Sequence, residues 1–135
     1  MLRIGRVVLV TAVIAAVAGG AALAGIAAVS KTQATRLTVT EVEYKLTLSR
    51  THVSAGATTF VVVDKGKLAH SLSISGPGLK KRLIAGTIKP GTSRTVSVTL
   101  KAGTFTLWCP QPGHAALGMK TSLKVGTAGT KSTWG

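Results

Sequence analysis

Hydrophobic and polar residues alternate through much of the chain after residue 30, a pattern typical of β-strands rather than helices. In residues 92–100, for example, Val96, Val98 and Leu100 fall on one face, because side chains two residues apart point the same way along a strand. No segment after residue 30 shows a sustained helical period. The predicted strands are residues 36–49, where the alternation is imperfect in phase, and residues 58–64, 92–100 and 103–108.

Glycine and proline residues separate these strands at the spacing of an antiparallel sandwich. They stand at Gly56, Gly66, Gly76, Pro77, Gly78, Pro90, Gly91 and Gly103. Residues 80–88 fit either a strand or an irregular crossover. Residues 127–135 are rich in Gly and Thr, and we predict a flexible tail there. Residues 31–126 are then one domain, of a size that can bury a single sandwich core.

The first thirty residues form a separate hydrophobic segment. Arg3 and Arg6 precede residues 7–29, which contain no charge and would span about 35 Å as a helix, enough to cross a bilayer. Two interpretations of residues 1–30 remain open: an N-terminal membrane anchor that is retained, or a signal peptide cleaved after Ala22, Leu23 and Ala24. Both export the domain to the periplasmic or extracellular face, either soluble or anchored by the N-terminal helix.

The charge of the chain is strongly unbalanced. Seventeen Lys and Arg residues against three Asp and Glu residues give a net charge of +14, and setting aside Arg3 and Arg6 leaves +12 on the exported part. Export removes nucleic acid as a partner, although the charge alone would suggest it. The basic residues fit either a solvated surface kept soluble by like charge, or a docking face for an acidic redox partner or an anionic membrane. The densest basic patch is Lys80, Lys81 and Arg82.

Candidate chemistry is concentrated in residues 108–119, WCPQPGHAALGM. This segment places Cys109, His114 and Met119 at intervals of four intervening residues, and its prolines and glycines make it turn-like. Cys109 is the only cysteine, so it cannot form an intramolecular disulfide, and metal ligation would explain an odd thiol outside the cytoplasm. A thiolate, an imidazole and a thioether are three of the four ligands of a mononuclear copper electron-transfer site, which has two His, one Cys and a weak axial Met.

The fourth ligand should be a histidine from elsewhere in the chain, and His70 is the candidate. Each proposed ligand continues the apolar face of a different strand. The residues that share parity are His70 with Leu72 and Ile74, Cys109 with Phe105 and Leu107, and Met119 with Leu123 and Val125. Strand ends of this kind would gather the ligands at one pole of a sandwich. The remaining histidine, His52, is expected to be a solvated imidazole at a surface turn.

Residues 108–119 have the pattern Trp-Cys-x-x-Pro-Gly-His-x-x-x-Gly-Met, with a terminal strand after it and DKGKLAH upstream at residues 64–70. This combination resembles the small type I (blue) copper proteins of the cupredoxin superfamily. The plastocyanin- and auracyanin-like branch is the most similar, over roughly residues 35–126. The resemblance implies an all-β, Greek-key antiparallel β-sandwich of seven or eight strands, here preceded by the N-terminal hydrophobic helix. It also implies one copper ion, Cu(I)/Cu(II), near one end, ligated by His70, Cys109 and His114, with Met119 as the weak axial ligand.

Two positions depart from the family pattern. Asp64 stands where relatives commonly have Asn, and we expect it to alter the hydrogen bonding that ties the two ligand loops together. Thr121 replaces a frequent Gly and is expected to stiffen the start of the last strand. Neither position is a ligand.

The leading functional hypothesis is an exported carrier of single electrons between redox partner proteins, because a mere carrier of copper does not require the full ligand set. The alternatives are a module for copper storage or delivery and a degenerate sandwich that serves only in protein interaction.

We predict no enzyme and no catalytic residues, since further copper centres would need more histidines and a binuclear centre would need two cysteines. We expect a monomer whose membrane association, if any, is through the N-terminal segment. Residues 115–117 form either an apolar rim for a partner or ordinary loop packing.

Overall fold

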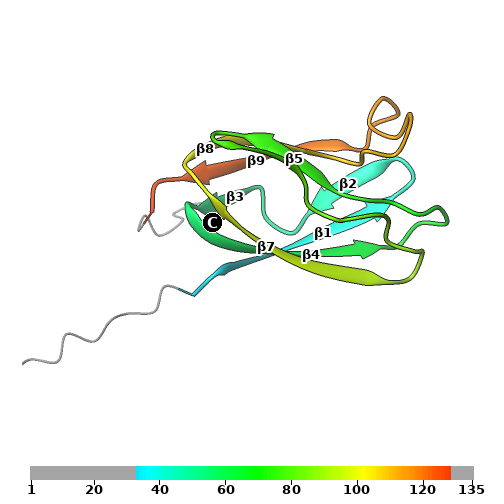
Figure 1. The fold of residues 1–135 in the computed structure, drawn as a ribbon, viewed down its shortest axis with the longest axis horizontal. Helices are drawn as coiled ribbons and strands as arrows, with labels where there is room; N and C mark the ends of the chain where they lie inside the picture. The colour runs from blue at the N-terminus through cyan, green and yellow to red at the C-terminus, as the bar shows by residue number, and fades with distance from the viewer. Residues whose placement is uncertain (1–32, 129–135) are drawn as a thin grey trace, which may run out of the picture. The chain divides into compact units, whose positions relative to one another are not determined.

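The computed structural model describes residues 33–128; the predicted N-terminal helix and most of the predicted tail lie outside this range. Within this range, nine strands form two sheets that face each other as the layers of a sandwich (Figure 1). The strands are β1 (Thr35–Val42), β2 (Lys45–Leu48), β3 (His52–Ser54), β4 (Gly56–Asp64), β5 (Ser73–Gly76), β6 (Leu79–Arg82), β7 (Ser93–Leu100), β8 (Gly103–Trp108) and β9 (Lys120–Gly126). Among residues 33–128 no helix is long and apolar enough to span a bilayer.

The two sheets are mixed rather than wholly antiparallel. The four-stranded sheet has the order β2-β1-β4-β7, and the five-stranded sheet has the order β3-β9-β8-β5-β6. β1 pairs with β4 in parallel, as β3 does with β9, and the other pairs are antiparallel. The parallel pairing of β1 with β4 is possible because β2 and β3 lie between them in the chain and provide the long connection that parallel strands need. The predicted all-β sandwich is confirmed, but two strand pairs depart from the antiparallel expectation.

The strand count also differs from the seven or eight that the resemblance implied. Residues 36–49 are two strands, because the chain turns at Glu43 and Tyr44 and β2 pairs back on β1. Residues 80–88 combine both expectations: they continue β6 to Arg82 and then cross irregularly, with Leu83, Ile84 and Ile88 buried. The predicted strands at residues 58–64, 92–100 and 103–108 correspond to β4, β7 and β8.

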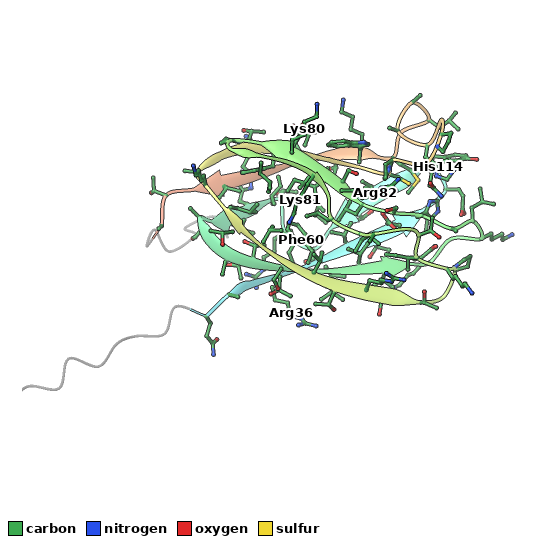
Figure 2. The ribbon with its side chains drawn as sticks, in the orientation of Figure 1. Arg36, Phe60, Lys80, Lys81, Arg82 and His114 are labelled. Atoms are coloured by element: carbon green, nitrogen blue, oxygen red, sulfur yellow. The ribbon has the colours of Figure 1, made fainter. Side chains whose placement is uncertain are left out.

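The alternation in the sequence fills the space between the sheets. β1 and β4 bury every second residue, and Phe60 of β4 lies between the two layers in Figure 2. From the opposite sheet, Phe105 and Leu107 are fully buried. The edge strand β6 instead exposes its charged residues, and Lys80 projects from the outside of the sheet in Figure 2. Charges on an edge strand discourage pairing with another chain.

Three strands of the larger sheet bring their ends to the same place. Ser73 at the start of β5 lies opposite Trp108 at the end of β8, and Trp108 lies opposite Lys120 at the start of β9. The segment before β5 and the loop between β8 and β9 therefore leave the sheet at one pole. The β8–β9 loop is the orange loop that extends beyond the strands in Figure 1.

Candidate metal centre

The β8–β9 loop is closed on itself by backbone hydrogen bonds. Cys109 follows β8 directly and Met119 directly precedes β9, and the Cys109 N–H donates to the Met119 carbonyl at 3.0 Å. The Met119 N–H donates in turn to the carbonyl of His114, also at 3.0 Å. These bonds extend the β8–β9 ladder by one step and fold the intervening residues back toward it. The three loop residues predicted as ligands are thus bonded to one another through their main chain.

Two glycines allow the tight course of this loop. Gly113 and Gly118 have φ angles of +79° and +119°, which side-chain-bearing residues rarely adopt. A Cβ at Gly118 would also lie 2.9 Å from the carbonyl oxygen of Tyr44. The predicted role of both glycines in the loop is confirmed.

His70 reaches the same pole from the connection between β4 and β5. Its main chain forms a reciprocal pair of hydrogen bonds with Ile88: the His70 N–H donates to the Ile88 carbonyl at 3.1 Å, and the Ile88 N–H donates back at 2.7 Å. The His70 side chain is fully buried. The irregular crossover after β6 therefore holds this histidine in place.

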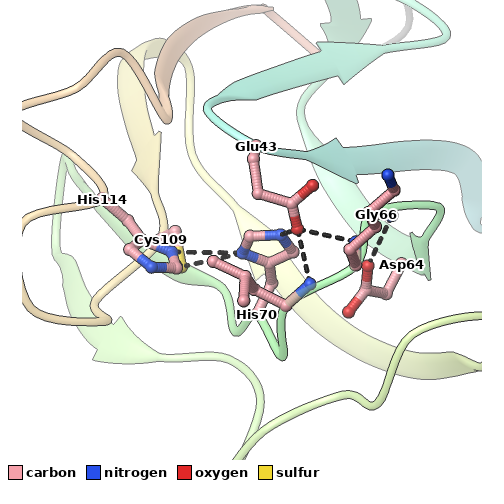
Figure 3. A network of polar contacts seen from close by, with 8 residues as sticks. Glu43, Asp64, Gly66, His70, Cys109 and His114 are labelled. Atoms are coloured by element: carbon pink, nitrogen blue, oxygen red, sulfur yellow. Dashed lines mark hydrogen bonds and ion pairs between the residues drawn. The ribbon is translucent and has the colours of Figure 1, made fainter.

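The side chains of the three strongest candidate ligands converge (Figure 3). The Nδ1 atoms of His70 and His114 lie 3.9 and 3.5 Å from the Cys109 sulfur, and 3.2 Å from each other. One donor atom from each residue falls within a group no wider than 4.8 Å, an arrangement that could hold a metal ion. Met119 is fully buried in the same core cluster as Cys109. His70, Cys109 and His114 thus come together, and with the buried Met119 they form a site of the type I copper kind.

The exposure of the ligands is unequal. His70, Cys109 and Met119 are buried, whereas His114 is partly exposed and lies at the end of the sandwich in Figure 2. Burial raises the pKa of the Cys109 thiol, and backbone hydrogen bonds from Gln111 and Ser71 act in the opposite direction. The thiol keeps its proton until a metal replaces it.

Glu43 contacts a candidate ligand, and the sequence did not predict it. It lies in the turn between β1 and β2, and its Oε1 atom accepts from the N–H groups of Lys67 and Leu68 at 2.8 and 2.6 Å and from His70 Nε2 at 3.0 Å. The backbone hydrogen bond from Leu68 is the largest cause that lowers the pKa of Glu43, to about 2. Burial acts next in size and in the opposite direction, but the hydrogen bonds from Lys67, Glu43 itself and His70 add to the lowering. The carboxylate is therefore ionised at neutral pH. The sequence offered one indication of a role for Glu43, namely that acidic residues are scarce in this basic chain.

The other two acidic residues lie beside the same segment and are buried. Glu41 on β1 is opposite Asp64 on β4 in the parallel register. Burial, and secondarily the charge of Asp64, raises the pKa of Glu41 to about 8. Neither carboxyl oxygen of Glu41 has a hydrogen-bond partner among the described residues.

The two departures from the family pattern have local effects. Asp64 accepts a hydrogen bond from the Gly66 N–H at 2.8 Å and so closes its own turn; among the described residues its Oδ2 atom has no partner. The contacts between the two ligand loops are instead those between His70 and the side chains of Cys109 and His114. Thr121 lies within β9, opposite Leu107.

His52 takes no part in this site. It is partly exposed and begins β3, so the expected surface turn is a short strand. It pairs with Lys124, near the end of β9 that is remote from Met119, and its Nδ1 atom lies 3.1 Å from the Thr51 hydroxyl.

Comparisons with known proteins bear on the fold. No family model matches the sequence, and no curated protein matches it significantly. Solved structures do match: reduced auracyanin from the photosynthetic bacterium Roseiflexus castenholzii is 18% identical, with a TM-score of 0.53 over 68% of this chain and 97% of that one. Auracyanin B is 19% identical, with a TM-score of 0.55 over 72% and 92%.

The chain has the cupredoxin fold. A copper nitrite reductase from Nitrosomonas europaea shares this fold, at 20% identity and a TM-score of 0.57 over 72% of this chain. This chain covers only 43% of that protein. The match therefore spans nearly the whole of each auracyanin but less than half of the nitrite reductase.

Proposed function

We propose that this protein is an exported type I copper protein that carries single electrons between redox partners outside the cytoplasmic membrane. The observation that carries the proposal is the convergence of His70 Nδ1, His114 Nδ1 and the Cys109 sulfur at the pole where Met119 also lies buried. A copper ion bound there would alternate between Cu(I) and Cu(II). The likeness of the fold to two auracyanins is compatible with this proposal.

The surroundings of the site suit repeated electron transfer. Each ligand is anchored by main-chain hydrogen bonds: His70 to Ile88, Cys109 to Met119, and Met119 to His114. These bonds keep the donor atoms in place when the charge of the metal changes. A site that rearranges little exchanges electrons quickly.

His114 offers the route by which an electron would enter and leave. It is the one partly exposed ligand, and its ring meets that of Tyr44 edge to face at a centroid distance of 5.1 Å. Exposed apolar side chains are present on the neighbouring segments: Leu117 is 61% exposed, Leu68 46% and Tyr44 37%. Such an apolar rim would let a partner approach the imidazole edge closely, which favours the rim interpretation of residues 115–117.

The visible spectrum of the copper-loaded protein tests this proposal. The Cu(II) protein should show a strong thiolate-to-copper charge-transfer band, which Cys109→Ala should abolish because the thiolate is its source. His52→Ala is the matched control and should keep the band, since His52 lies at the other end of β9. A colourless wild-type protein that ignores copper would refute the proposal.

The electron self-exchange rate separates a carrier from a storage or delivery module. A carrier should exchange rapidly and keep its copper against a weak chelator, because His70 and Cys109 are fully buried. Slow exchange together with ready loss of copper to the chelator would favour storage or delivery.

A further inference from the structure

Glu43 reaches from the β1–β2 turn to the connection between β4 and β5, which carries His70. It extends from the β1–β2 turn of the four-stranded sheet, whereas Cys109 and Met119 flank strands of the five-stranded sheet. Its carboxylate occupies the space left by Gly66, where a Cβ would overlap it. From there one oxygen receives the N–H groups of Lys67 and Leu68 and the Nε2 atom of His70 (Figure 3). A single side chain therefore fixes both the segment that carries His70 and the ring itself.

This contact determines which ring nitrogen of His70 carries the proton and which one can bind a metal. A carboxylate only accepts hydrogen bonds, so the Nε2 atom, 3.0 Å from Glu43 Oε1, must carry the proton. Nδ1 then presents its lone pair, and Nδ1 is the atom that faces the Cys109 sulfur and His114. Hydrogen bonding of this kind orients a ligand histidine and raises its basicity.

The contact also places a negative charge one imidazole ring away from the metal position. The whole chain has only three acidic residues, so little else offsets its positive charge. A fixed negative charge attracts Cu(II) more strongly than Cu(I), and the attraction is greater beside a buried ring than in water. His70 is fully buried, and the side chain of Glu43 is 22% exposed.

We propose that Glu43 is a positioning residue for this site: its carboxylate holds the His70 ring with Nδ1 toward the metal and lowers the reduction potential of the bound copper. The proposal rests on the proposed function, because it concerns the same site. Glu43 then does more than support the loop, because its charge makes the site bind Cu(II) more tightly relative to Cu(I).

The reduction potential of Glu43→Gln tests the electrostatic part. Glutamine has nearly the same size, and its amide oxygen can still accept from Lys67, Leu68 and His70, so the loop should persist. Loss of the charge should weaken Cu(II) binding relative to Cu(I) by at least tenfold, which corresponds to an increase in potential of about 59 mV for a one-electron couple. The charge-transfer band should remain.

A control for net charge is available at the far end of β4. Ala57 is exposed, seven residues before Asp64, and Ala57→Lys changes the net charge by the same single unit as Glu43→Gln. This variant should change the Cu(II)/Cu(I) preference by less than threefold. If Glu43→Gln also stays within threefold of wild type while its band is intact, Glu43 does not tune the copper and the proposal is overturned.

A measurement on the metal-free protein tests the positioning part without copper. Nitrogen NMR of the wild-type protein should show the His70 proton on Nε2, with slow exchange, and a proton on Nδ1 instead would overturn the proposal. This measurement also decides the matter if Glu43→Gln fails to fold. A wild-type protein with no charge-transfer band would instead defeat the proposed function itself, so the two failures are distinguishable.

Discussion

At the scale of single residues, Glu41 shows how strand geometry can override side-chain preference. It shares the parity of Leu37 and Val39, so β1 directs it into the core, opposite Asp64. A buried carboxylate without a hydrogen-bond donor is costly, and the group responds by retaining its proton. With a pKa of about 8, Glu41 is neutral at neutral pH.

This shift predicts an unusual pH dependence of stability for the metal-free protein. Between pH 4.5, the ordinary pKa, and about pH 8, the unfolded chain releases the Glu41 proton while the folded protein keeps it. The free energy of unfolding should therefore fall as pH rises through this range, by a few kcal/mol at about 1.4 kcal/mol per pKa unit. Denaturant unfolding of wild type and Glu41→Gln at pH 5 and pH 8 measures the effect.

Glutamine at position 41 is nearly isosteric and does not titrate, so the stability difference between the two proteins isolates this group. Relative to wild type, Glu41→Gln should gain stability from pH 5 to pH 8. A difference that is the same at both pH values would show that Glu41 is not protonated in the folded protein.

The ligand residues could be predicted from the sequence because their types are rare and their parity matches that of apolar neighbours. Cys109, His114 and Met119 stand at fixed spacing, and His70 continues the face of Leu72 and Ile74. Glu43 could not be found in this way. Its contact with His70 joins residues twenty-seven positions apart through a turn, and alternation says nothing about the direction of a turn residue.

At the scale of secondary structure elements, alternation predicted where strands lie but not which strands pair. A strand buries every second residue whether its neighbour is parallel or antiparallel, so the parallel pairing of β1 with β4 leaves no mark in the pattern. The split of residues 36–49 showed only as the imperfect phase of the alternation: β1 buries the odd-numbered Leu37 and Val39, whereas β2 buries the even-numbered Leu46.

The packing of β5 on β8 depends on the absence of a side chain at Gly76. A Cβ there would overlap the ring of Phe105, which is fully buried and cannot move without disturbing the core. We predict that Gly76→Ala lowers the free energy of unfolding by about 1–3 kcal/mol, the usual cost of overpacking.

Ser75→Ala is a suitable control, since Ser75 is the preceding, half-buried residue of the same strand. It should change stability by no more than about 0.5 kcal/mol. Equal effects of the two substitutions in a denaturant titration would contradict the packing argument.

At the scale of the whole molecule, positive charge dominates the surface. Fifteen basic residues remain when Arg3 and Arg6 are set aside, against three acidic residues, of which Glu41 and Asp64 are buried. Over residues 33–128 the exposed surface therefore presents almost only positive charge, including Lys80, Lys81 and Arg82 on the edge strand β6.

The sign of this charge should govern encounters with small redox reagents. Oxidation of the Cu(I) protein by the anion hexacyanoferrate(III) should slow as ionic strength rises, because salt screens the attraction. Oxidation by a cationic cobalt(III) phenanthroline complex should accelerate, because salt screens a repulsion. Stopped-flow rates at several salt concentrations provide the measurement, and the same response to both reagents would exclude electrostatic steering.

Main-chain hydrogen bonds link Cys109, His114 and Met119 to one another. The β8–β9 loop therefore keeps its shape largely through bonds within itself. An added or deleted residue between Gly113 and Gly118 would disturb the metal donors before it disturbed either sheet. The sandwich can thus serve as an unchanging frame while this one connection is exchanged or remodelled. Substitutions confined to the residues between Cys109 and Met119 could therefore change the properties of the metal centre without a change in either sheet.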